Sequence, residues 1–213
     1  MTDVEIVFEN DEILVINKPA GVAVQGGKDI AHPLDKELSL KLGYPVHLVH
    51  RLDRDTNGLL IVAKSTPAAA KWTKLIGGKL VSKEYIAVCA GRLPKKEGTI
   101  RSNIIQHGDE KNSVTHFKVL AEKEFNFEGE KIVLSKIRLK LETGRMHQIR
   151  IHLAKQNCPI AGDDKHGNFK LNKTLKKNLK IKNLLLCAQT LSIPLNGKPF
   201  VISIPLPDYM ELF

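Results

Sequence analysis

The sequence HLVHRLDRDTNGLLIVA, residues His47–Ala63, places a cluster of charged side chains directly before an apolar run. The run Leu59–Ala63 follows turn-forming polar residues and predicts a buried strand that begins just beyond the charges. We therefore expect Asp53 at the rim of a rigid element. Its neighbours Arg51 and Arg54 favour the ionised carboxylate where the side chains converge.

An ionised carboxylate that stays partly dry can act as a nucleophile in covalent catalysis. This property makes Asp53 a candidate catalytic residue. The alternative interpretation is a solvated loop of ion pairs without chemical function, which is the usual state of such charge clusters.

The composition indicates a globular chain with a proper core, because 42% of its 213 residues are apolar. No stretch approaches the roughly 20 apolar residues of a membrane span, and the acidic N-terminus does not resemble a signal peptide. We therefore expect a cytoplasmic protein without a membrane partner. The spacing of Cys89, Cys158 and Cys187 fits neither a disulfide framework nor a zinc site, and no histidine pair has HExxH spacing, so we expect no metal.

The charge balance favours a polyanionic partner, since 33 basic against 23 acidic residues give a formal net charge of +10. The excess is concentrated in residues 165–182, which contain seven lysines and no acid. Such a run is often only a solvated face. We interpret this one as a contact with RNA, carried by Lys173, Lys176 and Lys177.

Alternation and turn residues predict the N-terminal elements. They are a hairpin of strands 4–8 and 13–16, a helix over 34–42 closed by Gly43, a helix over 68–76 capped by Thr66 and Pro67, and a strand over 82–91. Trp72 and Ile76 mark the buried face of the second helix, and we interpret Trp72 as a core residue.

Further elements follow in the C-terminal half. Residues 112–120 and 131–141 predict an antiparallel pair, and 184–195 and 200–206 predict two strands around an Asn196-Gly197 turn. Thr143 is the expected cap of a helix with a buried stripe of Met146, Ile149 and Leu153 that ends at Asn157. The alternation there would also permit a strand.

The first stretch resembles the HRLDxxTSGLL signature of the RluA family of pseudouridine synthases. The resemblance covers His50–Asp53 and Thr56–Leu60, with Asn57 where the family usually has serine. It implies that Asp53 is the catalytic nucleophile. The turn Asn17–Gly21 resembles a second landmark of the family near the active site.

Two more stretches resemble motifs of the same family. The Lys-x-Tyr context at residues 83–85 implies that Tyr85 stacks on the target base and is a candidate proton acceptor. GRMHQIRIHLA at residues 144–154 implies that Arg150 pairs with the catalytic aspartate. Residues 162–167 resemble a GDxxYG turn in which His166 replaces the aromatic, and we interpret Asp163 and Asp164 as turn residues.

The resemblance implies an α/β fold of the α+β type, with an extended, mainly antiparallel sheet flanked by helices. It implies one pseudouridine synthase catalytic domain over residues 1–213, without the S4-like N-terminal domain of many relatives. The expected activity is isomerisation of specific uridines, with Arg51 entering the space of the flipped base and no cofactor. The residues expected to contact RNA are Arg51, His50, Arg54, Arg145, His147, Lys173, Lys176 and Lys177.

Within the family the sequence looks most like the RluC branch, which acts on large-subunit ribosomal RNA, and we expect a monomer. Three alternatives remain: a transfer-RNA synthase of the same family, a non-catalytic RNA-binding or ribosome-assembly factor, and a phosphodiesterase. In the last, Asp53, Asp55, Asp163 and Asp164 would bind a metal, and chelation would abolish activity.

Overall fold

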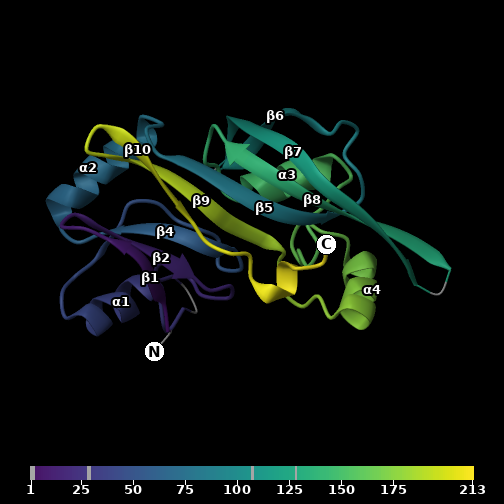
Figure 1. Ribbon diagram of the computed structural model, residues 1–213, viewed down its shortest axis with the longest axis horizontal. Helices are drawn as coiled ribbons and strands as arrows, with labels where there is room; N and C mark the ends of the chain where they lie inside the picture. Colours follow the sequence, from purple (N-terminus) through teal and green to yellow (C-terminus); the bar gives the residue numbers. More distant parts are fainter. Residues whose placement is uncertain (1–2, 28–29, 107, 128) are drawn as a thin grey trace. The chain divides into compact units, whose positions relative to one another are not determined.

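The computed structural model describes residues 3–27, 30–106, 108–127 and 129–213, which form two compact units (Figure 1). The first unit extends to Lys83 and also includes Ala188–Pro205. The second consists of Glu84–Cys187 and Leu206–Phe213. Both units combine helices with mainly antiparallel strands, so the predicted α/β fold class of the α+β type is confirmed.

The first unit is built on strands in the order β1-β2-β4-β9. Their bounds are β1 (Glu5–Glu9), β2 (Ile13–Lys18), β4 (Asn57–Ala63) and β9 (Leu186–Leu195); β3 (His47–Leu48) pairs with β4, and β10 (Lys198–Ser203) pairs with β9. The predicted hairpin is confirmed as β1 and β2. The Asn10 side chain organises its turn by accepting the backbone N–H groups of Glu12 and Ile13.

Strand β4 is the predicted apolar run, and all seven of its residues are buried. Gly58 at its start has a φ of 118° and lies against the backbone of Ala188 in β9. A Cβ atom at this position would collide with the Ala188 carbonyl group. The glycine after the charged loop is therefore required by the close approach of two strands as well as by its backbone angle.

Two helices belong to the first unit, α1 (Leu34–Leu42) and α2 (Thr66–Gly77). As predicted, Gly43 ends α1 in the left-handed region. The predicted cap of α2 was wrong by one residue, because the Ser65 side chain, not Thr66, accepts the N–H of Ala68. Trp72 is a core residue as expected, and its indole N–H donates to the carboxylate of Glu12.

The second unit contains strands in the order β5-β8-β7-β6. Their bounds are β5 (Ser82–Ala90, whose first two residues belong to the first unit), β6 (Glu97–Gln106), β7 (Asp109–Phe127) and β8 (Glu130–Leu141). The predicted antiparallel pair is confirmed as β7 and β8, which form a long hairpin (Figure 1). Ile137 and Leu139 are buried whereas Arg138 and Lys140 are exposed, as the alternation predicted.

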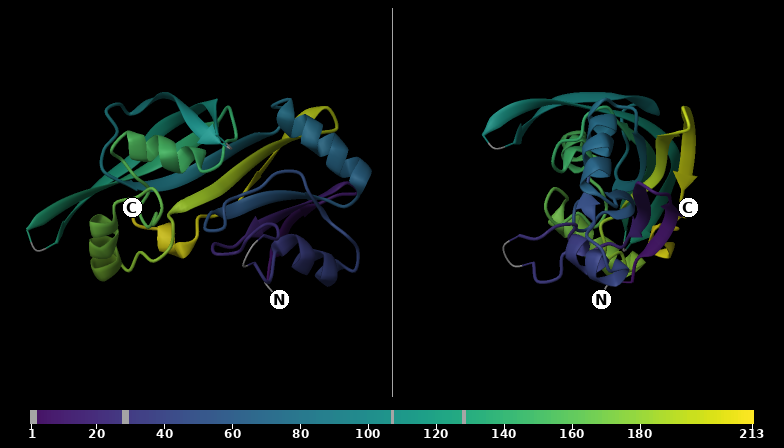
Figure 2. Two further views of the ribbon diagram at one scale, coloured as in Figure 1. Left: turned by 180° about the vertical axis from the view of Figure 1, so that it is seen from behind. Right: turned by 90° about the vertical axis from the view of Figure 1, so that its left-hand side faces the viewer.

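Helix α3 (Gln148–Lys155) corrects part of the sequence interpretation. It contacts β6 and β7, and Figure 2 shows it in front of these strands in the left view. Ile149 and Leu153 are buried as expected, but Met146 is 50% exposed and precedes the helix. Thr143 is not the cap, because His147 adopts a left-handed conformation (φ 54°) and the helix begins only after it.

The lysine-rich segment forms a helix, α4 (Phe169–Leu179), which the sequence analysis did not predict. The Asn168 side chain caps α4 by accepting the N–H of Leu171.

The predicted Asn196-Gly197 turn joins β9 to β10, and both of its residues have positive φ angles. A 3-10 turn, η1 (Asp208–Met210), lies near the C-terminus. Among the described residues, no helix is both long and apolar enough to cross a lipid bilayer.

Candidate active site

Asp53 lies in a loop of the first unit, between β3 and β4, and is half-buried. The loop is fastened to the Asn17–Gly21 turn by Lys18, whose side chain is fully buried. The Lys18 ammonium donates to the carbonyl oxygens of Pro19 (2.8 Å), Val22 (2.9 Å) and Arg54 (2.9 Å). The turn that resembles a family landmark thus holds the backbone of the residue next to Asp53.

The charge on Lys18 is part of this arrangement. Burial lowers the pKa of its ammonium to about 8, and the carboxylates of Asp55 and Asp53 oppose that shift. A buried ammonium beside two carboxylates and three carbonyl oxygens keeps all its donors occupied. Lys18 therefore contributes positive charge to the Asp53 loop as well as hydrogen bonds.

A second set of contacts joins the same two segments through Gly21 and Arg54. The Gly21 N–H donates to the Arg54 carbonyl (2.9 Å), and the Arg54 Nε donates to the Gly21 carbonyl (3.0 Å). Asn57 adds a hydrogen bond from its side-chain amide to the Lys18 carbonyl (3.1 Å). Asn57, where the family usually has serine, therefore makes a buried polar contact with the turn.

His50 has a structural contact in this loop. Its Nε2 accepts the backbone N–H of Ile61 in β4 (3.0 Å), so Nε2 carries no proton. Burial, together with the nearby Lys83 ammonium, lowers the pKa of His50 well below its ordinary value. The imidazole is therefore neutral and joins the loop to the strand, while its predicted contact with RNA stays a prediction.

In the second unit, Arg150 lies on α3 and is 6% exposed. Its guanidinium makes a two-pronged ion pair with Asp163, with Nε donating to Oδ2 (2.9 Å) and Nη2 donating to Oδ1 (2.7 Å). Burial opposes ionisation of Asp163, but Arg150 and the N–H groups of His166 and Lys165 hold the pKa of this carboxyl below its ordinary value. Asp163 is therefore charged and fixes the direction of the arginine fork.

Asp163 has the turn role that the sequence predicted and a second role in the ion pair with Arg150. Its Oδ1 accepts the backbone N–H groups of Lys165 (3.0 Å) and His166 (2.9 Å), which is the turn function. The ion pair with Arg150 was not expected. The predicted pairing of Arg150 with Asp53 stays a prediction, while Asp164 is exposed.

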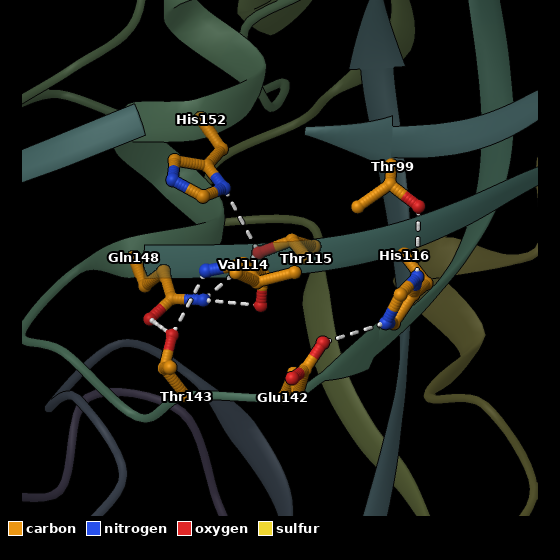
Figure 3. A network of polar contacts seen from close by, with 8 residues as sticks. All are labelled: Thr99, Val114, Thr115, His116, Glu142, Thr143, Gln148 and His152. Carbon is orange, nitrogen blue, oxygen red and sulfur yellow. Dashed lines mark hydrogen bonds and ion pairs between the residues drawn. The ribbon is translucent and has the colours of Figure 1, made fainter. Parts of the chain in front are cut away.

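The segment before α3 is fixed by the buried side chain of Gln148. Its amide donates to the Val114 carbonyl and the Thr115 hydroxyl, both at 3.0 Å, and its oxygen accepts from the Thr143 hydroxyl (2.8 Å) (Figure 3). One turn later, His152 Nδ1 lies 2.9 Å from the Thr115 hydroxyl. These contacts hold α3, and hence Arg150, against β7.

His147 and His166 form a pair at the rim of this region. His147 Nδ1 lies 2.8 Å from His166 Nε2, and the rings meet edge to face. One ring must donate and the other accept, so the two imidazoles share one proton between these atoms. His166, which replaces the aromatic of the GDxxYG-like turn, therefore contacts His147, the residue just before α3.

Tyr85 lies on β5, pairs in register with Leu139 of β8 and is 6% exposed. Arg51 is exposed, and Arg145 is half-buried with its Nε donating to the Asn112 carbonyl. The predicted lysines all lie on α4 and are exposed, namely Lys173, Lys176 and Lys177. The predicted residues thus divide between the two units, with His50, Arg51, Asp53 and Arg54 in the first and the others in the second.

In the described ranges, no three His, Cys, Asp or Glu side chains gather as a ligand set for a metal ion. The cysteines are buried and free, and Cys89 and Cys158 are close enough to share a hydrogen bond. Neither group of candidate site residues contains a cysteine.

Comparison with known proteins decides the family. The family model described as RNA pseudouridylate synthase matches residues 12–155, which include Asp53, Tyr85 and Arg150. The chain belongs to the RNA pseudouridylate synthase family. It is therefore an RNA pseudouridine synthase, an isomerase, as the sequence motifs implied.

Curated relatives of this synthase are named for the ribosomal large subunit. The ribosomal large subunit pseudouridine synthase C of Rickettsia prowazekii is 35% identical over 96% of the chain and 68% of the relative. The ribosomal large subunit pseudouridine synthase D of Pasteurella multocida is 33% identical over 97% of the chain and 69% of the relative. Among solved structures, human RNA pseudouridylate synthase domain containing 1 has a TM-score of 0.76 and 25% identity, over 95% of this chain and 83% of that one.

Three contacts of the synthase were missed by the sequence analysis. The first is the bond of the buried Lys18 to the Arg54 carbonyl, in a turn that was recognised. The second is the ion pair of Arg150 with Asp163, which was interpreted only as a turn residue. The third is the hydrogen bond between His147 and His166. Only the third had a signal in the sequence, namely that His166 replaces the aromatic residue of the family motif.

Proposed function

We propose that this synthase isomerises specific uridines of large-subunit ribosomal RNA, with Asp53 as the nucleophile. The observation that carries the proposal is the Asp53 loop, whose backbone is clamped by the buried Lys18. The names of the relatives support the choice of ribosomal RNA. The formal charge of +10 suits a substrate of this kind.

The reaction begins with extrusion of the target nucleotide, because a stacked uridine hides its glycosidic bond; unstacking costs a few kcal/mol. Arg51 is exposed and lies in the same loop as Asp53. Its planar guanidinium can stack on the bases that remain and hydrogen-bond to them, which an ammonium cannot match. We assign Arg51 the space vacated by the flipped base.

Asp53 then acts on the ribose, either by attack at the sugar or by abstraction of a proton that leads to a glycal. In both routes the bond between ribose C1′ and uracil N1 breaks and the uracil turns. When C5 bonds to C1′, the bond from C1′ to Asp53 breaks in the first route, and the abstracted proton returns to the sugar in the second. The proton on C5 then leaves and N1 is protonated. The product has the same atoms as the substrate, so the reaction consumes no cofactor.

Arg150 and Tyr85 have supporting roles in this proposal. Arg150 is charged, buried and held in direction by Asp163, which suits a residue that pairs with the catalytic carboxylate. Tyr85 stacks on the flipped uracil. A phenol with an ordinary pKa near 10 is a weak base, so we assign Tyr85 the stacking role before the proton role.

The remaining features of the proposal follow from the sequence. The synthase acts as a monomer in the cytoplasm, where ribosomal RNA is available, and residues 1–213 form one catalytic domain. Arg54, Arg145, His147 and the α4 lysines contact the RNA backbone together with the loop residue His50. Such contacts determine position and salt dependence rather than the identity of the target base.

The experiment maps pseudouridine by carbodiimide labelling and primer extension on unmodified ribosomal and transfer RNA. Asp53→Asn is nearly isosteric and serves as the matched control. New stops in ribosomal RNA with wild type alone are expected. Stops confined to transfer RNA would move the substrate to that class, and equal stops with Asp53→Asn would remove the nucleophile from the proposal.

A further inference from the structure

Helix α4 presents one face that combines an aromatic ring with lysines. Phe169, Lys173, Lys176 and Lys177 follow the spacing i, i+4, i+7 and i+8, which places them along one side of a helix. All four are exposed, and Phe169 is 84% exposed. We call these four residues the α4 stripe.

The opposite side of α4 already has its packing partners. Leu175 is fully buried, and Leu171, Asn172 and Leu179 are half-buried. The exposed Phe169 ring is therefore not needed to hold the helix on the protein. An exposed phenylalanine gains nothing from the fold, since burying such a side chain would contribute about 1.5–3 kcal/mol.

The charge distribution along α4 also opposes helix stability at one end. Lys176 and Lys177 lie in the last turn, where cations interact favourably with the helix dipole. Lys170 lies in the first turn, which contains no acidic residue and where positive charge is unfavourable. Its presence is explained by an anionic partner better than by the stability of the helix.

The position of α4 is tied to Arg150 through the turn of Asp163. The Asn172 side chain donates to the Asp163 carbonyl (2.9 Å) and accepts the Gly162 N–H (3.1 Å). Asp163 in turn holds the Arg150 guanidinium. The α4 stripe thus has a fixed placement relative to a candidate catalytic residue of the same unit.

We propose that the α4 stripe is a docking surface for an unpaired stretch of RNA, in which one base stacks on Phe169 and neighbouring phosphates contact Lys173, Lys176 and Lys177. An aromatic ring accepts the face of any base, and lysines track the backbone. The stripe has a single apolar residue, whereas a helix that lies on a membrane needs a broad apolar face. This inference rests on the proposed RNA substrate and adds the recognition of nucleotides that flank the target.

The test measures binding of a short, unstructured, fluorescein-labelled RNA made only of adenosine and cytidine, so that no uridine can react. The same RNA annealed to a complementary DNA strand, which contains no uridine, is the double-stranded probe. The variants are Phe169→Ala, Phe169→Trp and Lys173→Gln. Leu40→Ala is the matched control, because Leu40 is an exposed apolar residue on α1 (73% exposed).

We expect Phe169→Ala to raise the Kd for the single strand by roughly 5- to 100-fold, with an unchanged salt slope. Phe169→Trp should retain the affinity, and RNA should quench its additional indole emission. Lys173→Gln should lower the salt slope by about 0.7 between roughly 50 and 200 mM KCl. The duplex should bind Phe169→Ala and wild type equally, because its bases are already stacked.

Equal Kd values for Phe169→Ala and Leu40→Ala would overturn the docking surface, and so would an equal loss on single strand and duplex. The proposal would also be overturned, in favour of a membrane contact, if Phe169→Ala lost binding to anionic phospholipid vesicles while its binding of RNA was unchanged. Failure of the proposed function has a different signature. In that case wild type makes no pseudouridine in any RNA, while the dependence of RNA binding on Phe169 persists.

Discussion

Asp53 is carried by a loop whose backbone is fastened by another residue, whereas Arg150 is fastened through its own side chain. In the Asp53 loop, Lys18 and Gly21 bind the carbonyl of Arg54 and leave the carboxylate of Asp53 half-buried. In the Arg150 region, Asp163 binds the guanidinium directly in the protein interior. In the proposed reaction a nucleophile needs access to substrate and the residue that orients it needs rigidity, and the two kinds of support match these proposed roles.

The largest effect should follow from breaking the buried ion pair. Asp163→Asn keeps an oxygen for the turn N–H groups but removes the negative charge that Arg150 binds in the interior. Removal of one member of a buried pair costs about 3–5 kcal/mol, so we expect a loss of that size in the free energy of unfolding. Denaturant titration measures it.

The control is Lys41→Met, which removes an exposed partner of Asp3 and should cost less than about 1 kcal/mol. If Asp163→Asn lowered the free energy of unfolding as little as this control does, the ion pair with Arg150 would not stabilise the fold. The contrast between the two regions would then be lost.

A somewhat smaller effect is expected from the backbone support. Lys18→Met keeps the length of the side chain but removes the ammonium donor from the carbonyl groups of Pro19, Val22 and Arg54. The Arg54 carbonyl still accepts the Gly21 N–H. We expect a loss of about 3 kcal/mol in the free energy of unfolding, together with a fall in kcat because the loop next to Asp53 loosens. Exposed Lys36 provides the control Lys36→Met.

The readout that separates positioning from stability is turnover at a temperature where Lys18→Met is still folded. A normal kcat there would show that Lys18 stabilises the fold without positioning Asp53. RNA binding by the variant should change little in either case.

The smallest effect concerns pH and the contacts that hold α3. His152 is fully buried, and its ring nitrogens lie within hydrogen-bond distance of the Ser113 and Thr115 hydroxyls. Figure 3 shows the contact with Thr115. Burial, with the nearby Lys155 ammonium, lowers its pKa to about 4. The unfolded chain, with an ordinary histidine pKa near 6.5, therefore binds more protons than the folded chain between these values.

Stability from His152 is fully present above about pH 6.5 and is lost as the pH falls toward 4. The expected loss between about pH 7 and 5 is about 2 kcal/mol. Urea unfolding at a series of pH values measures it for wild type and His152→Gln. Identical pH slopes for the two proteins would mean that His152 does not carry this dependence.

Local patterns predicted much of the fold. The alternation in residues 131–141, the Asn196-Gly197 turn and the glycine after α1 each gave the observed element, because side-chain period and backbone angle depend on nearby residues. The predicted start of α3 was wrong because of contacts that the local pattern does not record. Thr143 has the chemistry of a cap, but its hydroxyl binds Gln148 and the Val114 N–H, which lies 29 residues away.

The candidate site shows the same division. Motif resemblance identified the stretches of Asp53, Tyr85 and Arg150, since the residue types and their spacing are properties of the sequence. It did not show what holds them. The burial of Lys18 and its bond to the Arg54 carbonyl, 36 residues away, depend on the approach of two segments that no local pattern records.

The sequence alone determined the buried β4 strand, the hairpin turns, the basic charge and the residue types of the site, all of which follow from composition and from neighbours along the chain. Only the tertiary structure decided that Arg150 is paired with Asp163, that His147 meets His166, and that the lysine run is a helix with an exposed phenylalanine. The physical reason is that hydrogen bonds and burial depend on distances in space, and packing fixes these distances only after the chain has folded.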